Sequence, residues 1–333
     1  MLDNCYEKIL AEKNMWLAWR RFRKGKRHKR DVQEFERELE SHFLAIQRDL
    51  LSGSYAHGAY RTFIVHDPKR REINAPVIRD QLVHQMIWNV LFPFFNNRFS
   101  PSVYSCRPER GTHAVVAKIQ KIRRRYPYRT EVWAMHLDIR KFFDTVPHDR
   151  LLEALRFWIG CPHTMALLET IIASRPKGIP LGNLTSQLFC NVILMSFDQA
   201  LYSAGLQPRY VRYADDCLVL GDDQGEVQSI ARYCEALLIE LGFTSLWTVR
   251  KYHGFEALGK RFFDAGLDLR RNAKNHAEHK WFSAVQQGLS DGGNLRMLES
   301  RFQSFSGLVP AGDRRWTRRL RDVILEQSVN NYG

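Results

Sequence analysis

Apolar positions recur every three or four residues through the first part of the chain, as they do in amphipathic helices. The clearest run covers residues 31–51, where the apolar side chains would share one helix face. The Ser-Gly-Ser sequence at 52–54 follows this run and should end the helix, because these residues favour turns. We therefore predict that residues 1–60 are mainly helical.

The pattern changes to that of a β-hairpin at residue 60. Residues 60–65 are rich in β-favouring side chains, and Pro68 presets a bend shortly afterwards, so we predict a second strand over 71–76. The tip carries the cations Lys69 and Arg71. Such cations could clamp a triphosphate, although taken alone they suit a solvated loop better.

Helices and strands alternate through the middle of the chain. The apolar spacing predicts helices over 80–95, over 112–126, from about Pro147, after 183–185 and over about 225–241. Residues 132–139 alternate in polarity as a strand does, with Trp133, Met135, Leu137 and Ile139 on the core side. This alternation places Asp138 near the strand end on the open face, where a carboxylate can serve a ligand.

The stretch from 209 to 221 contains two adjacent carboxylates, Asp215 and Asp216, between β-favouring runs. Asp is disfavoured within strands and common in turns, so we predict both acids at the tip of a hairpin. A solvated turn is the simplest interpretation of this pair alone. Two adjacent carboxylates are otherwise costly unless a cation neutralises them, and hard oxygen ligands suit Mg²⁺ or Mn²⁺.

Asp138 can join this pair if the strands that carry the three acids are neighbours in one sheet. Three carboxylates around two metal ions, which lie about 3.5–4 Å apart, form a layout for in-line phosphoryl transfer. The sequence contains no nucleophile elbow, P-loop or H-E-x-x-H motif. The attacking group would then be a 3′-hydroxyl of the substrate itself.

Composition adds a partner class to this prediction. The net charge of +14 indicates a polyanion, with nucleic acid preferred over an anionic membrane. The candidate nucleic-acid-binding residues are Arg20, Arg21, Arg23, Lys24, Arg107, Arg110, Arg314, Arg315 and Arg318. No run of 18 apolar residues and no basic-then-apolar leader occurs, so we expect a cytoplasmic protein without a membrane partner. The six scattered cysteines predict buried small side chains, not a zinc or disulfide framework.

Five blocks occur in an order that resembles the reverse transcriptases over about residues 60–260. They are 63–80 and 104–112 for the first two blocks, 137–144 for polymerase motif A, 178–187 for motif B, and Tyr213-Ala214-Asp215-Asp216 for the Y-x-D-D of motif C. Within the family, Gly182 to Gln187 and the chain length resemble the diversity-generating retroelement enzymes of bacteria and phages.

The resemblance implies an α+β right-hand polymerase fold. The fingers would cover 1–130 with a contribution from 150–178, and the palm, with its antiparallel sheet, would cover 131–262. A helical thumb would cover 263–333.

The resemblance also implies site roles. Asp138, Asp215 and Asp216 would hold two Mg²⁺ ions, or Mn²⁺, and Ile139 would add a backbone carbonyl. Phe143 matches the steric gate beneath the sugar, whereas its neighbour Phe142 is the better candidate for the core. The remaining nucleotide-binding positions are Arg71, Lys69, Leu181, Gly182 and Gln187.

The implied function is RNA-directed DNA synthesis by two-metal-ion nucleotidyl transfer. Leu181 stands where accurate enzymes of the family carry Gln, which implies error-prone copying at adenines. The expected partners are template RNA, the RNA–cDNA duplex, dNTPs and a small basic helical accessory protein.

Two other interpretations remain open. The chain could be a reverse transcriptase of a retron, a phage-defence system or a group II intron, although the segment after 262 is short for an intron maturase with an endonuclease. A retron-like Asn-Ala-x-x-His occurs at 272–276, downstream of the predicted palm. A non-catalytic RNA-binding scaffold on a polymerase fold is the alternative of another class, and the complete acid triad argues against it.

Overall fold

A computed structural model describes residues 1–66, 70–264 and 266–269, which contain both helices and sheets. The chain divides into two compact units. The first comprises Met1–Ile122, Met135–Val219 and Gln228–Thr248; the second comprises Arg123–Ala134, Leu220–Val227 and the chain from Val249. The mixed helix and strand content agrees with the predicted α+β class.

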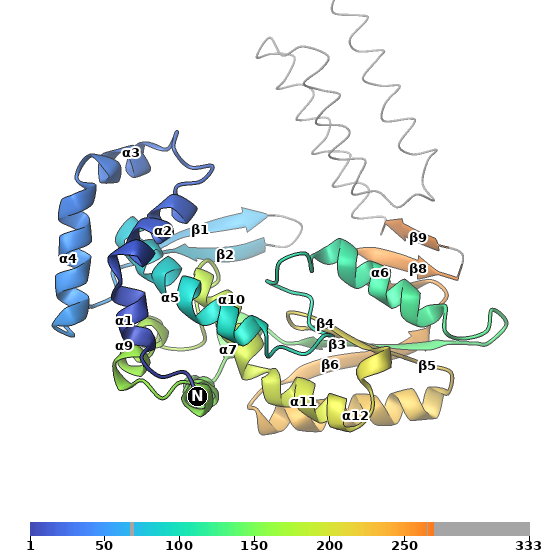
Figure 1. The fold of residues 1–333 in the computed structure, drawn as a ribbon. Coiled ribbons are helices and arrows are strands. Elements are labelled where there is room, and N and C mark those ends of the chain that lie inside the picture. The colour runs from blue at the N-terminus through green and yellow to red at the C-terminus, as the bar shows by residue number, and fades with distance from the viewer. Residues whose placement is uncertain (67–69, 265, 270–333) are drawn as a thin grey trace, which may run out of the picture. The chain divides into compact units, whose positions relative to one another are not determined.

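The N-terminal part of the first unit is helical, as predicted. It forms α1 (Cys5–Leu10), α2 (Glu12–Phe22), α3 (Arg30–Arg37) and α4 (Leu39–Leu51) (Figure 1). The prediction of one helix over 31–51 is wrong, because Glu38 leaves the helical conformation with φ −117°. Phe35 of α3 stacks on Trp19, whereas α4 buries Phe43, Ile46 and Leu50. Phe35 also stacks on His42 of α4, so the two helices remain in contact across the break.

A two-stranded hairpin and a long helix follow. β1 (Arg61–His66) pairs antiparallel with β2 (Arg70–Ala75), which confirms the predicted hairpin. Helix α5 (Ile78–Asn96) then packs against α1, α2 and α10 (Leu184–Ile193) at the centre of the first unit. Helix α6 (Thr112–Arg123) is the last before the main sheet.

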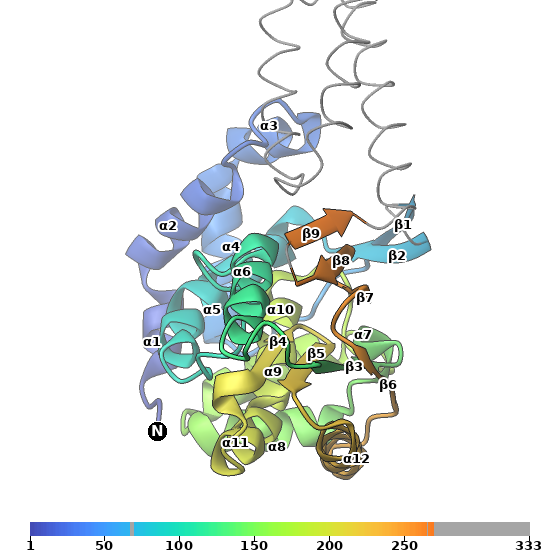
Figure 2. The same cartoon turned by 90° about the vertical axis from the view of Figure 1, so that its right-hand side faces the viewer.

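The main sheet has four strands in the order β4 (Tyr210–Tyr213), β5 (Asp216–Gly221), β3 (Trp133–Ile139) and β6 (Ser245–Lys251). Figures 1 and 2 show α11 (Met195–Ser203) and α12 (Gln224–Glu240) on the same side of this sheet. The indole of Trp247 in β6 donates a hydrogen bond to Glu235 of α12 at 3.0 Å. The predicted alternation of β3 holds for its second half, where Leu137 and Ile139 are buried and Asp138 is half-buried.

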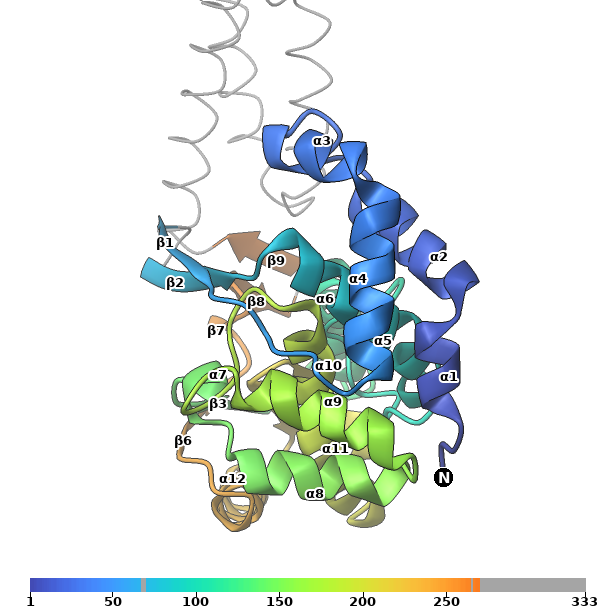
Figure 3. The same cartoon turned by 90° about the vertical axis from the view of Figure 1, so that its left-hand side faces the viewer.

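Four further elements belong to the first unit. They are α7 (Phe142–Thr145), α8 (His148–Trp158), α9 (Pro162–Ala173) and the 3₁₀ turn η1 (Gln207–Arg209). Helix α8 begins directly after Pro147, as predicted, and buries Leu151 and Leu155. Figure 3 shows α8 and α9 lying side by side.

The second unit contains a three-stranded antiparallel sheet. Its strands are β7 (Phe255–Ala257), β8 (Lys260–Phe263) and β9 (Gly266–Leu269). Arg123, 6% exposed, pairs with Asp264 at 2.7 Å within this unit. Most of the predicted thumb, including Arg314, Arg315 and Arg318, lies outside the described residues.

Two further expectations bear on side chains and length. Cys5, Cys190, Cys217 and Cys234 are buried as predicted, whereas Cys106 is exposed. Among the helices that the structure describes, none has an apolar stretch with the length needed to cross a bilayer.

Candidate active site

The Y-x-D-D sequence forms a two-residue turn between β4 and β5. Tyr213 pairs with Asp216 across the hairpin, so Ala214 and Asp215 occupy the turn itself. Both acids therefore lie at the tip of the hairpin, as predicted, with Asp215 in the turn and Asp216 as the first residue of β5. Ala214 has φ 55°, in the left-handed region, as tight hairpin turns require at a central position.

Asp138 interacts electrostatically with this turn because β3 and β5 are neighbours in the sheet. The pKa of Asp215 is raised to about 6, first by burial and then by the negative charges of Asp216 and Asp138, while the positive charge of Arg71 opposes the shift. The sheet therefore brings together the carboxylates of Asp138 and Asp215, which are far apart in the sequence.

A histidine that the sequence analysis did not single out contacts the acids. The Nε2 atom of His136, two residues before Asp138 on β3, lies 2.5 Å from Oδ1 of Asp216. Strand alternation puts His136 and Asp138 on one face. That periodicity was the signal for this residue, since it places any polar side chain at position 136 beside the acid at position 138.

The three carboxylates fit a divalent cation in charge and in ligand type. Each is half-buried, each offers the hard oxygen atoms that Mg²⁺ prefers, and their mutual repulsion raises the pKa of Asp215. Over the described ranges, however, no three His, Cys, Asp or Glu side chains are positioned to hold a metal ion together.

The β1–β2 hairpin supplies a cation, Arg71, whose charge acts on the pKa of Asp215. Arg71 of β2 is exposed and pairs with Val65 of β1. Its positive charge lowers the pKa of Asp215, so the two residues share one electrostatic environment. Lys69, the other predicted cation of the tip, lies outside the described residues.

Motif B packs against the same strand. The backbone N–H of Asn74 in β2 donates to the carbonyl of Leu181 at 2.9 Å. Gly182 has φ 135°, and a Cβ at this position would lie 2.6 Å from the Asn74 carbonyl oxygen. Only glycine fits this approach. Leu181 is half-buried, and Gly182 and Gln187 are exposed, so all three can be reached from solvent.

The two phenylalanines of motif A divide as expected. Phe142 is 2% exposed and packs on Phe243, whereas Phe143 is half-exposed. The Phe143 carbonyl accepts a hydrogen bond from Ile179 at 2.7 Å. Gly178 has φ 67°, and a Cβ there would lie 2.4 Å from that same carbonyl. The first two residues of motif B therefore fix the backbone of Phe143.

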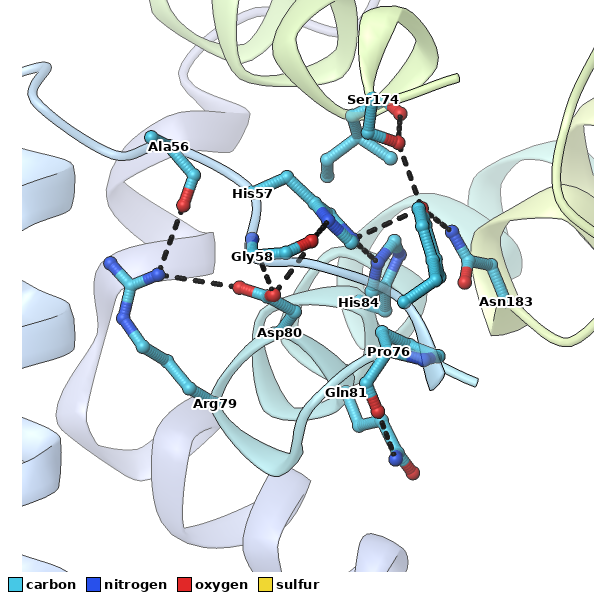
Figure 4. Close-up of polar contacts among 12 residues, drawn as sticks. Ala56, His57, Gly58, Pro76, Arg79, Asp80, Gln81, His84, Ser174 and Asn183 are labelled. Carbon is cyan, nitrogen blue, oxygen red and sulfur yellow. Dashed lines mark hydrogen bonds and ion pairs between the residues drawn. The ribbon is translucent and has the colours of Figure 1, made fainter. Parts of the chain in front are cut away.

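A buried polar network joins the start of α5 to the start of α10, and sequence patterning gave no signal for it. Figure 4 shows His57 between Gly58 and His84. His57 Nδ1 donates to the Gly58 carbonyl at 2.7 Å, and its Nε2 lies 3.1 Å from His84 Nε2. His84 Nδ1 lies 2.7 Å from the Thr185 hydroxyl.

Burial lowers the pKa of His84 to about 3, with a further contribution from His57. The His84 imidazole is therefore neutral at physiological pH. Asp80, fully buried beside it, accepts from the Gly58 N–H at 2.8 Å, as Figure 4 shows. It also accepts from the Tyr55 hydroxyl at 2.9 Å.

Asn183 belongs to the same network. Asn183 occupies the N-cap position of helix α10, but its side chain makes no capping bond. Its amide N–H donates to the Tyr60 hydroxyl at 2.9 Å, and Thr185 bonds to His84 of α5. The polar side chains of motif B thus link it to Tyr60 and to α5.

The predicted nucleic-acid-binding arginines differ in their contacts. Arg20 and Lys24 are exposed, whereas Arg21 donates to Asn89, and Arg23 pairs with Glu36. Arg107 donates to the carbonyls of Asn96, Ser100 and Val103, and Arg110 donates to that of Pro101. These last two side chains bind the loop that carries them.

The chain belongs to the reverse transcriptase family. The family described as "Reverse transcriptase (RNA-dependent DNA polymerase)" matches residues 66–247, which is more than half of the chain. This match covers motifs A, B and C and all three acids.

Named relatives include bacterial and intron-encoded proteins. Protein YkfC of Escherichia coli K12 is 28% identical over 240 residues, which cover 59% of this chain and 63% of that protein. The mitochondrial nuclear intron maturase 1 of Arabidopsis thaliana is 27% identical over 108 residues, or 32% of this chain and 14% of the maturase. The chain thus spans less than two thirds of either relative.

Among solved structures, a Cas6-RT-Cas1–Cas2 complex is similar, with a TM-score of 0.42 and 23% identity. The similarity covers 71% of this chain and 41% of the matched chain.

Proposed function

We propose that this protein is an RNA-directed DNA polymerase that extends a primer with dNTPs on an RNA template. The observation that carries the proposal is the electrostatic coupling of Asp138 on β3 with Asp215 at the β4–β5 turn. Membership of the reverse transcriptase family supports it. We assign the helices and the hairpin of residues 1–130 to fingers, the four-stranded sheet to a palm, and the chain from 263 to a thumb.

Asp138, Asp215 and Asp216 would hold two Mg²⁺ or Mn²⁺ ions, with a backbone carbonyl from Ile139. When bound, such ions activate the primer 3′-hydroxyl and neutralise the charge that develops on the departing pyrophosphate. His136 contacts the Asp216 carboxylate from the neighbouring strand β3, on the face that carries Asp138, and would orient it.

The nucleotide would lie between the β1–β2 hairpin and motif B. Arg71 would contact the triphosphate, assisted by Lys69, because guanidinium groups pair with phosphate oxygens in bidentate geometry. Phe143 would pack beneath the deoxyribose and exclude a 2′-hydroxyl. Leu181, Gly182 and Gln187 would face the base and sugar, on a backbone that the Asn74–Leu181 hydrogen bond ties to β2.

The exposed basic residues Arg20 and Lys24 would contact the phosphate backbone of the template RNA or of the RNA–cDNA duplex. The net charge of +14 supports such a polyanionic partner.

Two subgroups are consistent with this activity. Leu181 and the Gly-Asn-Leu-Thr-Ser-Gln sequence of motif B favour a diversity-generating retroelement enzyme that works with a small basic accessory protein and copies adenines inaccurately. The names of several relatives, which are intron maturases and intron proteins, favour an enzyme related to group II introns instead.

The activity is tested by primer extension on an RNA template with Mg²⁺. We expect Asp216→Asn to abolish dNTP incorporation while RNA binding stays intact, because one metal ligand is lost without a change in side-chain volume. Asp149→Asn, an exposed acid on α8, is the matched control and should extend normally. Incorporation by the Asp216 variant would refute the assignment of the metal ligands.

The subgroup is tested by sequencing the cDNA. We expect errors concentrated opposite template adenines, and we expect Leu181→Gln to reduce them. Accurate copying of adenines by the unaltered protein would favour the intron-related alternative.

A further inference from the structure

A buried ion pair between Arg212 and Asp198 contacts the Y-x-D-D turn. Arg212 of β4 is 1% exposed and Asp198 of α11 is 2% exposed. The two form a bidentate pair, with Nε to Oδ1 at 2.8 Å and Nη2 to Oδ2 at 2.6 Å. The Tyr210 hydroxyl also donates to Asp198 Oδ1 at 2.7 Å. Both carboxylate oxygens are therefore used to orient one guanidinium.

The remaining donor of that guanidinium points to the turn. Arg212 Nη1 donates to the carbonyl of Ala214 at 3.0 Å and to Asn191 Oδ1 at 3.2 Å. Ala214 is the residue with φ 55°, a conformation that is unfavourable for a non-glycine residue. A charge-assisted hydrogen bond to its carbonyl offsets part of this cost.

The backbone of Arg212 is held from the opposite side. Its N–H donates to the Ser102 carbonyl at 2.8 Å, and its carbonyl accepts from the Tyr104 N–H at 2.9 Å. The strand before the turn is thus fixed by its neighbour β5, by the 102–104 segment and by the guanidinium. A small change in the guanidinium position would move Ala214 and, with it, the Asp215 carboxylate.

We propose that Arg212, oriented by Asp198, is a positioning residue that sets the geometry of the Ala214–Asp215 turn and hence of the metal-binding carboxylates. The inference rests on the proposed function, because it concerns the same acids. Arg212 contacts neither substrate nor metal in this proposal, and it acts only through the Ala214 carbonyl.

The first test is Arg212→Lys, which keeps the positive charge that Asp198 requires. A single ammonium cannot reproduce the bidentate pair and also reach Ala214. We expect a folded protein whose kcat for single-nucleotide extension falls about 100-fold, as misplacement of reacting groups by about 1 Å produces. The KM for dNTP and the affinity for the primer–template should stay within about twofold.

The second readout does not depend on turnover. The electron paramagnetic resonance signal of free Mn²⁺ measures how tightly the protein binds Mn²⁺ without nucleotide. We expect this affinity to weaken about tenfold or more in Arg212→Lys. Tyr210→Phe is the matched control, since it removes one bond to Asp198 but leaves every bond of the Arg212 guanidinium in place. Its kcat and Mn²⁺ affinity should match those of the unaltered protein.

A double variant separates positioning from stability. Arg212→Gln/Asp198→Asn removes both charges and leaves no buried unpaired ion, so it should fold even if a single variant does not. We expect it to regain thermal stability relative to Arg212→Gln without regaining kcat or Mn²⁺ affinity. Recovery of all three together, or an Arg212→Lys variant that matches the unaltered protein in kcat and Mn²⁺ affinity, would overturn the proposal.

The outcome for Asp216→Asn, measured beside these variants, identifies which idea fails. If Asp216→Asn is inactive while Arg212→Lys is unaffected, the positioning role is wrong and the metal site stands. If Asp216→Asn is active, the proposed function itself is wrong.

Discussion

At the scale of single residues, the candidate site depends on contacts between side chains of different elements. Asp138 and Asp216 lie on the neighbouring strands β3 and β5. His136 of β3 contacts Asp216, and Arg212 of β4 pairs with Asp198 of α11. Strand alternation places His136 beside Asp138, but spacing along the chain does not reveal these partners on other elements.

The side chain of Phe143 gives a prediction at this scale. Phe143→Val shortens the side chain on a backbone that Ile179 and Gly178 hold in place, so it should open space beneath the sugar. We expect incorporation of rNTPs relative to dNTPs to rise by about 10- to 100-fold, the range that a pocket contact of this size discriminates. Single-nucleotide extension with matched rNTP and dNTP pairs measures the ratio.

Phe157→Val is the control for this experiment, because Phe157 is an aromatic side chain on α8 with 71% exposure. Its sugar selectivity should not change. An unchanged ratio in Phe143→Val would remove Phe143 from the steric-gate role.

At the scale of elements, periodicity predicted most helices and strands of the first unit, including β1–β2, α5, β3 and α12. It failed where tertiary packing decides. The run over 31–51 keeps helical spacing throughout, but the chain leaves the helical conformation at Glu38, and α3 and α4 contact α2 at different side chains, Trp19 and Trp16.

The network between α5 and α10 predicts a pH dependence of stability. His84 has a pKa of about 3 in the folded protein, below the ordinary value of 6.5, because burial disfavours its charged form. Between these values the unfolded chain binds a proton that the folded protein does not. Stability from this group is therefore complete above pH 6.5 and falls on acidification by up to about 1.4 kcal/mol per pH unit.

Urea unfolding between pH 7 and pH 4.5 measures this slope. We expect His84→Gln to flatten it, whereas His113→Gln, which alters an exposed histidine on α6, should not. Equal slopes for the unaltered protein and His84→Gln would show that His84 is protonated within the fold.

At the scale of the whole molecule, the order of strands in the sheet could not be deduced from the chain alone. The sequence places β3, β4, β5 and β6 in that order, but the sheet places β3 between β5 and β6. Because β3 lies beside β5, Asp138 comes close to the β4–β5 turn. The resemblance to the family predicted that the three acids lie together, whereas the local sequence pattern was only compatible with it. The high positive charge indicated a nucleic-acid partner without locating the site.

The most direct test of the account is the number of Mn²⁺ ions bound to the protein with primer–template and dNTP, compared between the unaltered chain and Asp138→Asn. The account predicts two ions for the unaltered chain and fewer for the variant, with Asp149→Asn unchanged. An Asp138→Asn protein that binds the same number of ions with the same affinity would contradict it.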